Sequence, residues 1–180
     1  MQNNRALFIG RFQPFHNGHL NVIKTLLENH KEVVVVIGSA QEENTAENPF
    51  SAAVRLEMIK SCFSKSDLAR LVIIQINDIK DNHKWVEHVL KHTPKFDIPR
   101  SGVPISSHNR SNDYVVYSNN ELVRELFLKE GFIVQATRIF DREVHAGEEI
   151  RKLILSNGNW ERFVPESVEK IIKQKNKYDL

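Results

Sequence analysis

Two histidines stand three residues apart in the segment GRFQPFHNGHL, which spans residues 10–20. His16 and His19 can point to the same side of a helix that begins there, so both rings can donate hydrogen bonds to one group. Arg11 adds a permanently charged fork of donors. Gly18 opens the helix without a side chain in the way, and the free N–H groups of a helix N-terminus favour phosphate. The segment therefore predicts a site that stabilises the charge of a polyphosphate while a bond to phosphorus breaks, with no protein nucleophile required.

Gly10 and Pro14 shape the turn that carries this chemistry. Glycine lets the backbone turn and approach a ligand closely, and proline stiffens the turn. The alternative interpretation is a glycine-bearing turn with incidental histidines. We favour the phosphate site because an open parallel sheet binds ligands beyond the carboxyl ends of its strands, and this segment directly follows an apolar run.

The elements that must position the segment begin with two short apolar runs, ALFIG at residues 6–10 and VVVVIG at residues 33–38. Continuous apolar runs of this kind are typical of strands buried on both faces of a parallel sheet. Between them, Leu20, Ile23 and Leu27 recur at helical spacing. The pattern predicts a strand–helix–strand unit with a right-handed crossover.

The alternation of strands and helices continues to the end of the chain. We predict further strands at 71–76, 114–118 and 132–136, and helices at 51–63, 84–90, 121–129, 148–155 and 165–175. Repeated strand and helix with short connections predicts an α/β fold with a doubly wound parallel sheet, Rossmann-like in character. Residues 98–113 show neither period and predict a long inserted loop, with a passive insertion favoured over a lid or an oligomer contact. We expect one domain over residues 1–180.

Composition narrows the class of protein. The 180 residues are 41% hydrophobic and 27% charged, with a formal net charge of +2, which is typical of one globular domain. There is no basic arm, so nucleic acid binding is not supported. No apolar run approaches the roughly 20 residues of a membrane span, and the N-terminal apolar run is too short for a signal peptide. We expect a cytoplasmic protein without membrane contact, in which the single cysteine, Cys62, is a buried structural thiol.

The segment GRFQPFHNGH resembles the signature of the nucleotidylyltransferase superfamily with its HxGH box, in the form of the archaeal-type nicotinamide mononucleotide (NMN) adenylyltransferases. The resemblance extends in order along almost the whole chain. It is carried by the blocks IGSAQEENTAENPFSAAVR (37–55), NDIKDNHKW (77–85), VVYSNNELVRELF (115–127), GEEIRKLI (147–154) and NWERFVPESV (159–168). The HxGH box indicates the superfamily, and the combined blocks point to the nicotinamide enzymes.

This resemblance implies transfer of AMP from ATP to the 5′-phosphate of NMN, giving NAD and pyrophosphate, with Mg²⁺ accompanying ATP and no separate metal site. It implies that His16 and His19 bind the ATP phosphates and stabilise the transition state at the α-phosphorus, while Arg151 holds the β and γ phosphates. Family members commonly form symmetric oligomers, so a homo-oligomer is expected. The residues implied to bind ATP are Gly10, Arg11, Phe12, His16, Gly18, His19, Asn119, Arg142, Gly147, Ile150 and Arg151, and those implied to bind NMN are Ser39, Asp78 and Trp85.

The chain departs from the family in one box. Where the family has S-G-T-x-I-R, this chain has Ala146, Gly147, Glu148, Glu149, Ile150 and Arg151. Both hydroxyl positions are lost, so hydroxyl contacts to phosphate are not expected, although backbone N–H groups can still bind the anion. Alternative functions are adenylyl transfer to nicotinate mononucleotide, FMN or pantetheine phosphate, or a non-catalytic nucleotide sensor.

Several of these residues also have a purely structural interpretation. Trp85 could pack in the core, and one of the two asparagines, Asn119 and Asn120, could cap the next helix. Arg55 and Arg142 match family positions, but the helical setting of Arg55 also permits a plain salt bridge. The pair formed by His88 and His92 has the spacing of metal ligands on a helix, but without a third ligand a solvated helix face is favoured.

Overall fold

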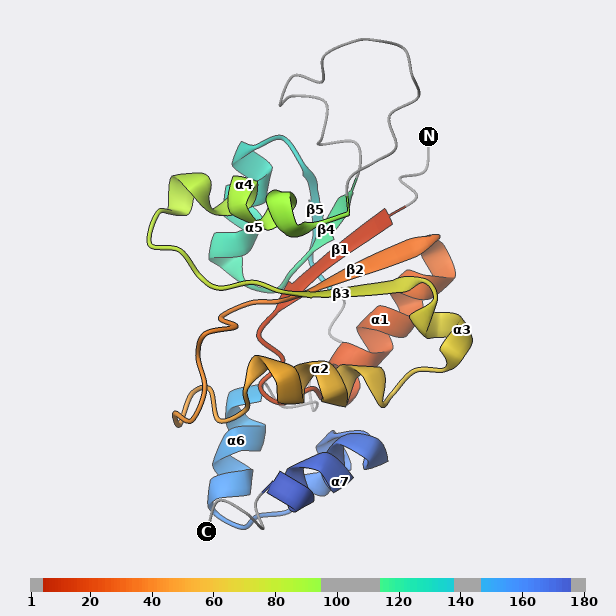
Figure 1. Cartoon of the computed structure of the whole chain (residues 1–180), viewed down its shortest axis with the longest axis vertical. Helices are drawn as coiled ribbons and strands as arrows, with labels where there is room; N and C mark the ends of the chain where they lie inside the picture. The colour runs from red at the N-terminus through yellow and green to blue at the C-terminus, as the bar shows by residue number, and fades with distance from the viewer. Residues whose placement is uncertain (1–4, 95–113, 138–146, 176–180) are drawn as a thin grey trace.

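The computed structural model describes residues 5–94, 114–137 and 147–175. Five parallel strands form one sheet in the order β3-β2-β1-β4-β5 (Figure 1). The strands are β1 (Arg5–Gly10), β2 (Glu32–Ile37), β3 (Leu71–Gln75), β4 (Val115–Tyr117) and β5 (Ile133–Gln135). The chain starts in the middle of the sheet, runs outward through β2 and β3, and then crosses to the other side of β1. The strand order therefore reverses between β1 and β4, which is where open α/β sheets form a ligand crevice. The predicted α/β sheet is confirmed.

The helices follow the strands in the predicted alternation. They are α1 (Asn17–Asn29), α2 (Ala52–Lys60), α3 (Lys65–Leu68), α4 (Asn82–His92), α5 (Glu121–Lys129), α6 (Gly147–Leu155) and α7 (Glu166–Lys175), with a short 3₁₀ helix, η2 (Glu161–Phe163), before the last. The sequence did not predict α3, because one turn of helix is too short to show periodicity. A capping box stabilises α3 instead: the Ser64 hydroxyl accepts from the Asp67 backbone N–H, and the Asp67 side chain accepts from the Ser64 N–H.

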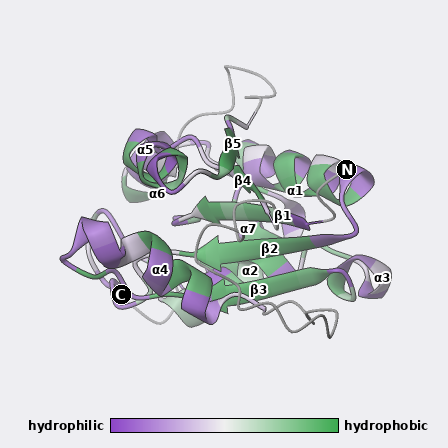
Figure 2. Ribbon diagram, turned by 90° about the horizontal axis from the view of Figure 1, so that it is seen from above, coloured by the Kyte–Doolittle hydropathy of each residue, from purple (hydrophilic) through white to green (hydrophobic). Residues whose placement is uncertain are grey.

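Alternate residues of the central strands enter two different cores. In β1, Ala6 and Phe8 pack into the core that also holds residues of α1, α2 and α7. Leu7 and Ile9 pack into the other core, with residues of α4 and α5. Figure 1 shows α4 and α5 on one side of the sheet and α1, α2 and α7 on the other, and Figure 2 shows the central strands as mainly hydrophobic ribbon between more hydrophilic helices. Burial on both faces explains why the strands appear in the sequence as continuous apolar runs.

Three expectations from the sequence have different outcomes here. Cys62 is half-buried rather than buried, because α2 ends at Lys60, just before it. Its thiol donates to the Met58 carbonyl at 3.2 Å. Within the described residues, no helix combines the length and the apolarity that crossing a membrane requires. The expected loop at 98–113 lies outside the described residues.

Candidate functional site

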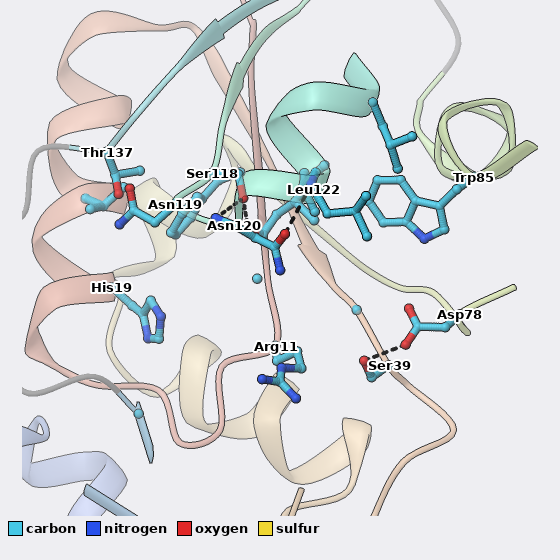
Figure 3. Close-up of a pocket in the computed structure, with 18 of the residues that line it drawn as sticks. Arg11, His19, Ser39, Asp78, Trp85, Ser118, Asn119, Asn120, Leu122 and Thr137 are labelled. Carbon is cyan, nitrogen blue, oxygen red and sulfur yellow. Dashed lines mark hydrogen bonds between the residues drawn. The ribbon is translucent and has the colours of Figure 1, made fainter. Parts of the chain in front are cut away.

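A cavity of about 860 Å³ opens at the carboxyl ends of the parallel strands (Figure 3). Every strand contributes the residues that follow it. They include Gly10 and Arg11 after β1, Gly38 and Ser39 after β2, Asp78 after β3, Ser118 and Asn119 after β4, and Thr137 after β5. The cavity thus occupies the place where the reversal of strand order predicts a ligand crevice.

The two histidines of the HxGH box line one part of this cavity. His16 is the N-cap residue of α1, and His19 lies in the first turn. Their rings stack with centroids 3.6 Å apart and 27° between the ring planes. The side chain of His16 does not cap the helix, and the first turn of α1 carries no acidic residue. The N–H groups at this helix end therefore face the site without a competing side-chain acceptor, as an anion site requires.

Both imidazoles are held in the neutral form. Burial lowers the pKa of His16 from 6.5 to about 4. Burial also lowers the pKa of His19 well below 6.5, and the neighbouring His16 lowers it further, because two adjacent imidazolium charges repel. The Nδ1 atoms of both rings are buried without a hydrogen-bond partner among the described residues. At neutral pH the pair thus offers neutral N–H donors.

Phe12 supports this pair from beneath. Its side chain is 1% exposed, and its ring meets the His19 ring edge-on with centroids 4.8 Å apart. Phe12 has a φ of 54°, which turns the chain sharply after β1. A Cβ atom at position 10 would meet the Phe12 ring at 3.1 Å, so the close packing of this ring is a second reason for Gly10. The structure therefore places the Phe12 side chain in the core rather than on the cavity wall.

Arg151, the predicted arginine of α6, lies behind the loop of residues 11–16, called the histidine loop. Arg151 donates from Nη1 to the Gln13 carbonyl at 2.8 Å, and it is Gly147, rather than Arg151 itself, that lines the cavity. A Cβ atom on Gly147 would come within 2.9 Å of the same carbonyl oxygen. Burial lowers the pKa of Arg151, and so does the positive charge of Arg11. A polyanion between the two guanidinium groups would relieve their repulsion. Ile150, which is also on α6, is fully buried in the core.

Gln13 ties the histidine loop to the segment before α2. Its side-chain amide donates to the Phe50 carbonyl at 2.7 Å and its amide oxygen accepts from the Phe50 N–H at 3.1 Å. The Gln13–Pro14 peptide bond is cis. The backbone oxygen that Arg151 contacts therefore belongs to a residue whose side chain is fixed by two hydrogen bonds to Phe50.

The residues predicted to bind the acceptor nucleotide lie together at the other part of the cavity. The Ser39 hydroxyl donates to an Asp78 carboxylate oxygen at 2.6 Å, as the dashed line in Figure 3 shows. Trp85 is half-buried, lines the cavity, and meets Phe127 edge-on with ring centroids 6.0 Å apart. In the view of Figure 3, His19 lies on one side of Arg11, and Asp78 and Trp85 lie on the other.

The two asparagines after β4 both line the cavity. Asn120 also caps α5, because its side-chain oxygen accepts from the Val123 N–H at 3.1 Å. The resemblance placed the segment YSNN, which contains Ser118, on the nucleotide side of the site, and Ser118 lines the cavity. The sequence did not single out Thr137 or Asn82, although both line the cavity. Their signal was their position, since Thr137 comes soon after β5 and Asn82 begins α4.

Comparison with known proteins adds to this geometry. A family model described as cytidylyltransferase-like matches residues 7–153. The chain belongs to the cytidylyltransferase-like family. A relative named nicotinamide-nucleotide adenylyltransferase from Archaeoglobus fulgidus is 41% identical to it over 175 residues, covering 94% of this chain and 91% of the relative. One of the same name from Saccharolobus solfataricus is 40% identical over 171 residues, covering 94% and 90%. The predicted resemblance to the archaeal-type NMN adenylyltransferases is confirmed.

Solved structures share the fold of this cytidylyltransferase-like chain at low sequence identity. A bifunctional NMN adenylyltransferase/ADP ribose pyrophosphatase from Francisella tularensis superposes with a TM-score of 0.68 at 20% identity, covering 97% of this chain and 54% of that one. A second structure of that protein, complexed with AMP and a manganese ion, has a TM-score of 0.66 at 20% identity. At this level of identity the likeness concerns the fold.

Other predicted residues of this cytidylyltransferase-like chain have different outcomes. Arg55 makes no salt bridge among the described residues and instead donates to the backbone carbonyls of Arg11, Gly38 and Ser39. Arg142 and the substituted Ala146 lie outside the described residues. The His88 and His92 rings meet edge-on with centroids 4.8 Å apart, but no group of three potential metal ligands forms within residues 5–94, 114–137 and 147–175.

Proposed function

We propose that this chain transfers AMP from ATP to the 5′-phosphate of NMN, forming NAD and releasing pyrophosphate. The observation that carries the proposal is the cavity itself, which is lined in one part by the stacked His16 and His19 and in the other by Ser39, Asp78 and Trp85. Relatives about 40% identical over 94% of the chain are named for this activity.

The reaction needs positioning and charge stabilisation more than a protein nucleophile. A 5′-phosphate oxygen of NMN attacks the α-phosphorus of ATP and forms a new P–O bond. The bond from the α-phosphorus to the bridging oxygen breaks, and pyrophosphate leaves with the electron pair. His16 and His19, both neutral in the free chain, donate N–H hydrogen bonds to the phosphate oxygens where negative charge develops, and the N–H groups at the start of α1 add to them.

Positive charge for the β and γ phosphates comes from Arg11 and Arg151. Arg11 is exposed on the cavity wall, and Arg151 is held on the Gln13 carbonyl close behind it. The α6 helix begins at Gly147, which lines the cavity, so its first backbone N–H groups take the place of the missing hydroxyls in binding the pyrophosphate.

The acceptor end of the cavity suits a cationic pyridinium ring. Trp85 offers an indole face, and a cation is attracted to it. Asp78, fixed by the Ser39 hydroxyl, is a negative charge close by, which attracts the pyridinium and repels the carboxylate of the nicotinate analogue. NMN is therefore the acceptor we expect, with nicotinate mononucleotide used less well.

Magnesium arrives with ATP. Asp78 is the sole acidic residue of the described part of the chain that lines the cavity, and no group of three potential metal ligands forms in that part. The donor set therefore fits an ion that keeps water and phosphate oxygens as its ligands, which is the habit of Mg²⁺. When bound, the ion neutralises phosphate charge. A structural neighbour complexed with AMP and manganese supports use of a divalent ion.

One assay tests the function. Purified protein is mixed with ATP, Mg²⁺ and each acceptor in turn: NMN, nicotinate mononucleotide, FMN and pantetheine phosphate. We expect pyrophosphate and NAD from NMN, and a lower kcat/KM with the nicotinate analogue. If ATP binds but no acceptor is adenylylated, the chain is a nucleotide sensor and the proposal is wrong. A homo-oligomer, a cytoplasmic location and a single domain over residues 1–180 stay predictions.

A further inference from the structure

Arg55 is a fully buried arginine on α2, directly beneath the cavity. Its guanidinium group donates three hydrogen bonds, all to backbone carbonyls. Nη1 contacts the Arg11 oxygen at 2.9 Å and the Gly38 oxygen at 2.9 Å, and Nη2 contacts the Ser39 oxygen at 3.0 Å. The Nε atom is buried without a partner among the described residues.

A buried cation without a carboxylate partner is costly for a fold. Among the described residues Arg55 forms no ion pair. Burial lowers its pKa from 12.5 to about 10 and Arg11 lowers it further, while the more distant carboxylates of Asp78 and Glu43 act in the opposite direction without offsetting the burial. The side chain thus remains a cation at neutral pH and is desolvated. Stability alone is better served at such a position by an apolar side chain of similar size. The three carbonyls explain what the cation does there.

Those carbonyls belong to two loops that carry different halves of the site. The β1 loop, residues 11–16, leads from the first strand to the histidine pair. The β2 loop, residues 38–41, holds Ser39, whose φ of 48° and hydroxyl bond to Asp78 set the acceptor end. One backbone bond, from the Gly38 N–H to the Gly10 oxygen at 3.0 Å, joins the loops at their base. Beyond that bond, the Arg55 guanidinium donates hydrogen bonds to both loops.

We propose that Arg55 is a positioning residue that fixes the β1 loop against the β2 loop, and thereby holds bound ATP and the bound acceptor at the distance and angle that phosphoryl transfer needs. The inference rests on the proposed function. A planar guanidinium can reach two loops at once because its donors diverge from one rigid fork, whereas an ammonium group is a single point. Without the fork each loop keeps its own ligand contacts, but the relative position of the two substrates is no longer fixed.

The kinetic signature follows from this geometry. Because each half of the site stays intact, Arg55→Lys is expected to bind ATP alone and NMN alone with dissociation constants within about threefold of the original chain, while kcat falls about 100-fold, the loss that a small misplacement of reacting groups produces. The lysine keeps the positive charge, so an unchanged kcat would mean that the guanidinium fork is not needed.

A control for the loss of a guanidinium fork is available in Arg70, which is exposed where Arg55 is buried. This arginine also donates to three backbone carbonyls, those of Leu27, His30 and Lys31, at the C-terminal end of α1 and away from the cavity lining. Arg70→Lys removes a comparable fork and is expected to leave kcat unchanged. Thermal unfolding gives the Tm of each variant, and the assays are run well below the lower of the two values.

The experiment measures binary binding of each substrate by calorimetry and steady-state turnover for the original chain and both variants. A kcat loss confined to Arg55→Lys, with both affinities kept, supports the inference. Loss of affinity for one substrate with kcat kept, unchanged kcat, or an equal kcat loss in Arg70→Lys overturns it. If Arg55→Lys does not fold, Arg55→Gln replaces it, and failure of both to fold assigns Arg55 to stability alone. If the original chain makes no NAD, the proposed function and this inference both fail. If the original chain and Arg55→Lys are equally active, this inference alone fails.

Discussion

The rings of His16 and His19 stack with their centroids 3.6 Å apart, and the Phe12 ring meets His19 edge-on at 4.8 Å. Two neutral imidazoles are thus packed against each other at the N-terminus of α1, with a buried aromatic ring fixing the second. This packing holds the two rings in one arrangement in the free chain, and preorganised donors of this kind need little reorganisation when charge develops on a phosphate.

His19→Ala should reduce turnover much more than acceptor binding. Loss of one preorganised donor to a developing anionic oxygen costs about 100- to 1,000-fold in kcat. Steady-state kinetics with NMN as the varied substrate measure the effect, and the NMN dissociation constant measured separately serves as the control. An equal loss in turnover and in NMN affinity would show that His19 mainly shapes the site.

The stability of the chain should fall as the pH is lowered through the histidine range. The folded-state pKa of His16 is about 4, below the unfolded value of 6.5, so between these values the unfolded chain binds more protons than the folded chain. The free energy of unfolding therefore decreases as the pH falls within this window, and His19, shifted in the same direction, adds to the decrease. His16→Asn should make the decrease shallower. Chemical denaturation at several pH values measures it, and parallel profiles for the two chains would contradict the assignment.

Trp85→Ala should weaken acceptor binding. Loss of a cation–π contact with the pyridinium predicts a KM for NMN raised by about 10-fold, with the KM for ATP little changed. Trp160, the other tryptophan of the chain, is the control because it is 6% exposed and lies in the core beside α7. Fluorescence quenching by NMN should disappear in Trp85→Phe and persist in Trp160→Phe. Quenching that survives in Trp85→Phe would place the ring away from the acceptor.

Gly147→Ala should push the start of α6 away from the histidine loop. The new Cβ atom would meet the Gln13 carbonyl oxygen at 2.9 Å, a backbone atom held by its own contacts, so the helix must move and the Arg151 bond to that oxygen must lengthen. We expect a loss of stability of about 1–3 kcal/mol, as for other overpacked sites, together with lower kcat.

Gly158→Ala is the matched control for that variant. Its Cβ atom would meet Leu153 Cδ2 at 2.8 Å, the far end of a flexible side chain that can turn aside. Thermal unfolding and turnover of both variants are compared with those of the original chain. Similar small effects in the two would mean that α6 is free to shift without consequence for the site.

Much of the fold was predictable because apolar runs buried on both faces leave a clear pattern. The strands at residues 6–10 and 33–38 differ from β1 and β2 by one residue at each end or less. The short strand β5 lies within the strand predicted at 132–136, whereas the single turn α3 was missed, since four residues carry little periodicity. Half of the candidate site could equally be predicted from the sequence, because Gly10, Arg11 and the HxGH histidines lie within one ten-residue segment.

Contacts across the fold decided the rest of the site. The helical sequence pattern around Arg55 permits a salt bridge. The tertiary structure instead brings Arg55 beneath the Arg11, Gly38 and Ser39 carbonyls. The resemblance grouped Phe12 and Ile150 with the ATP contacts, and packing places both side chains in the core. Ser118 and Thr137 reach the cavity because their strands end at the same edge of the sheet.

By itself the sequence predicted a phosphate site at the first strand–helix turn, since residue types and helical spacing are local properties. Only the tertiary structure decided how that site is completed. The two histidines are neutral because packing desolvates them, and Arg151 reaches the site through the carbonyl of a residue 138 positions earlier. Desolvation and long-range hydrogen bonds depend on which surfaces meet, and that is set by the order of the strands in the sheet rather than by any stretch of sequence.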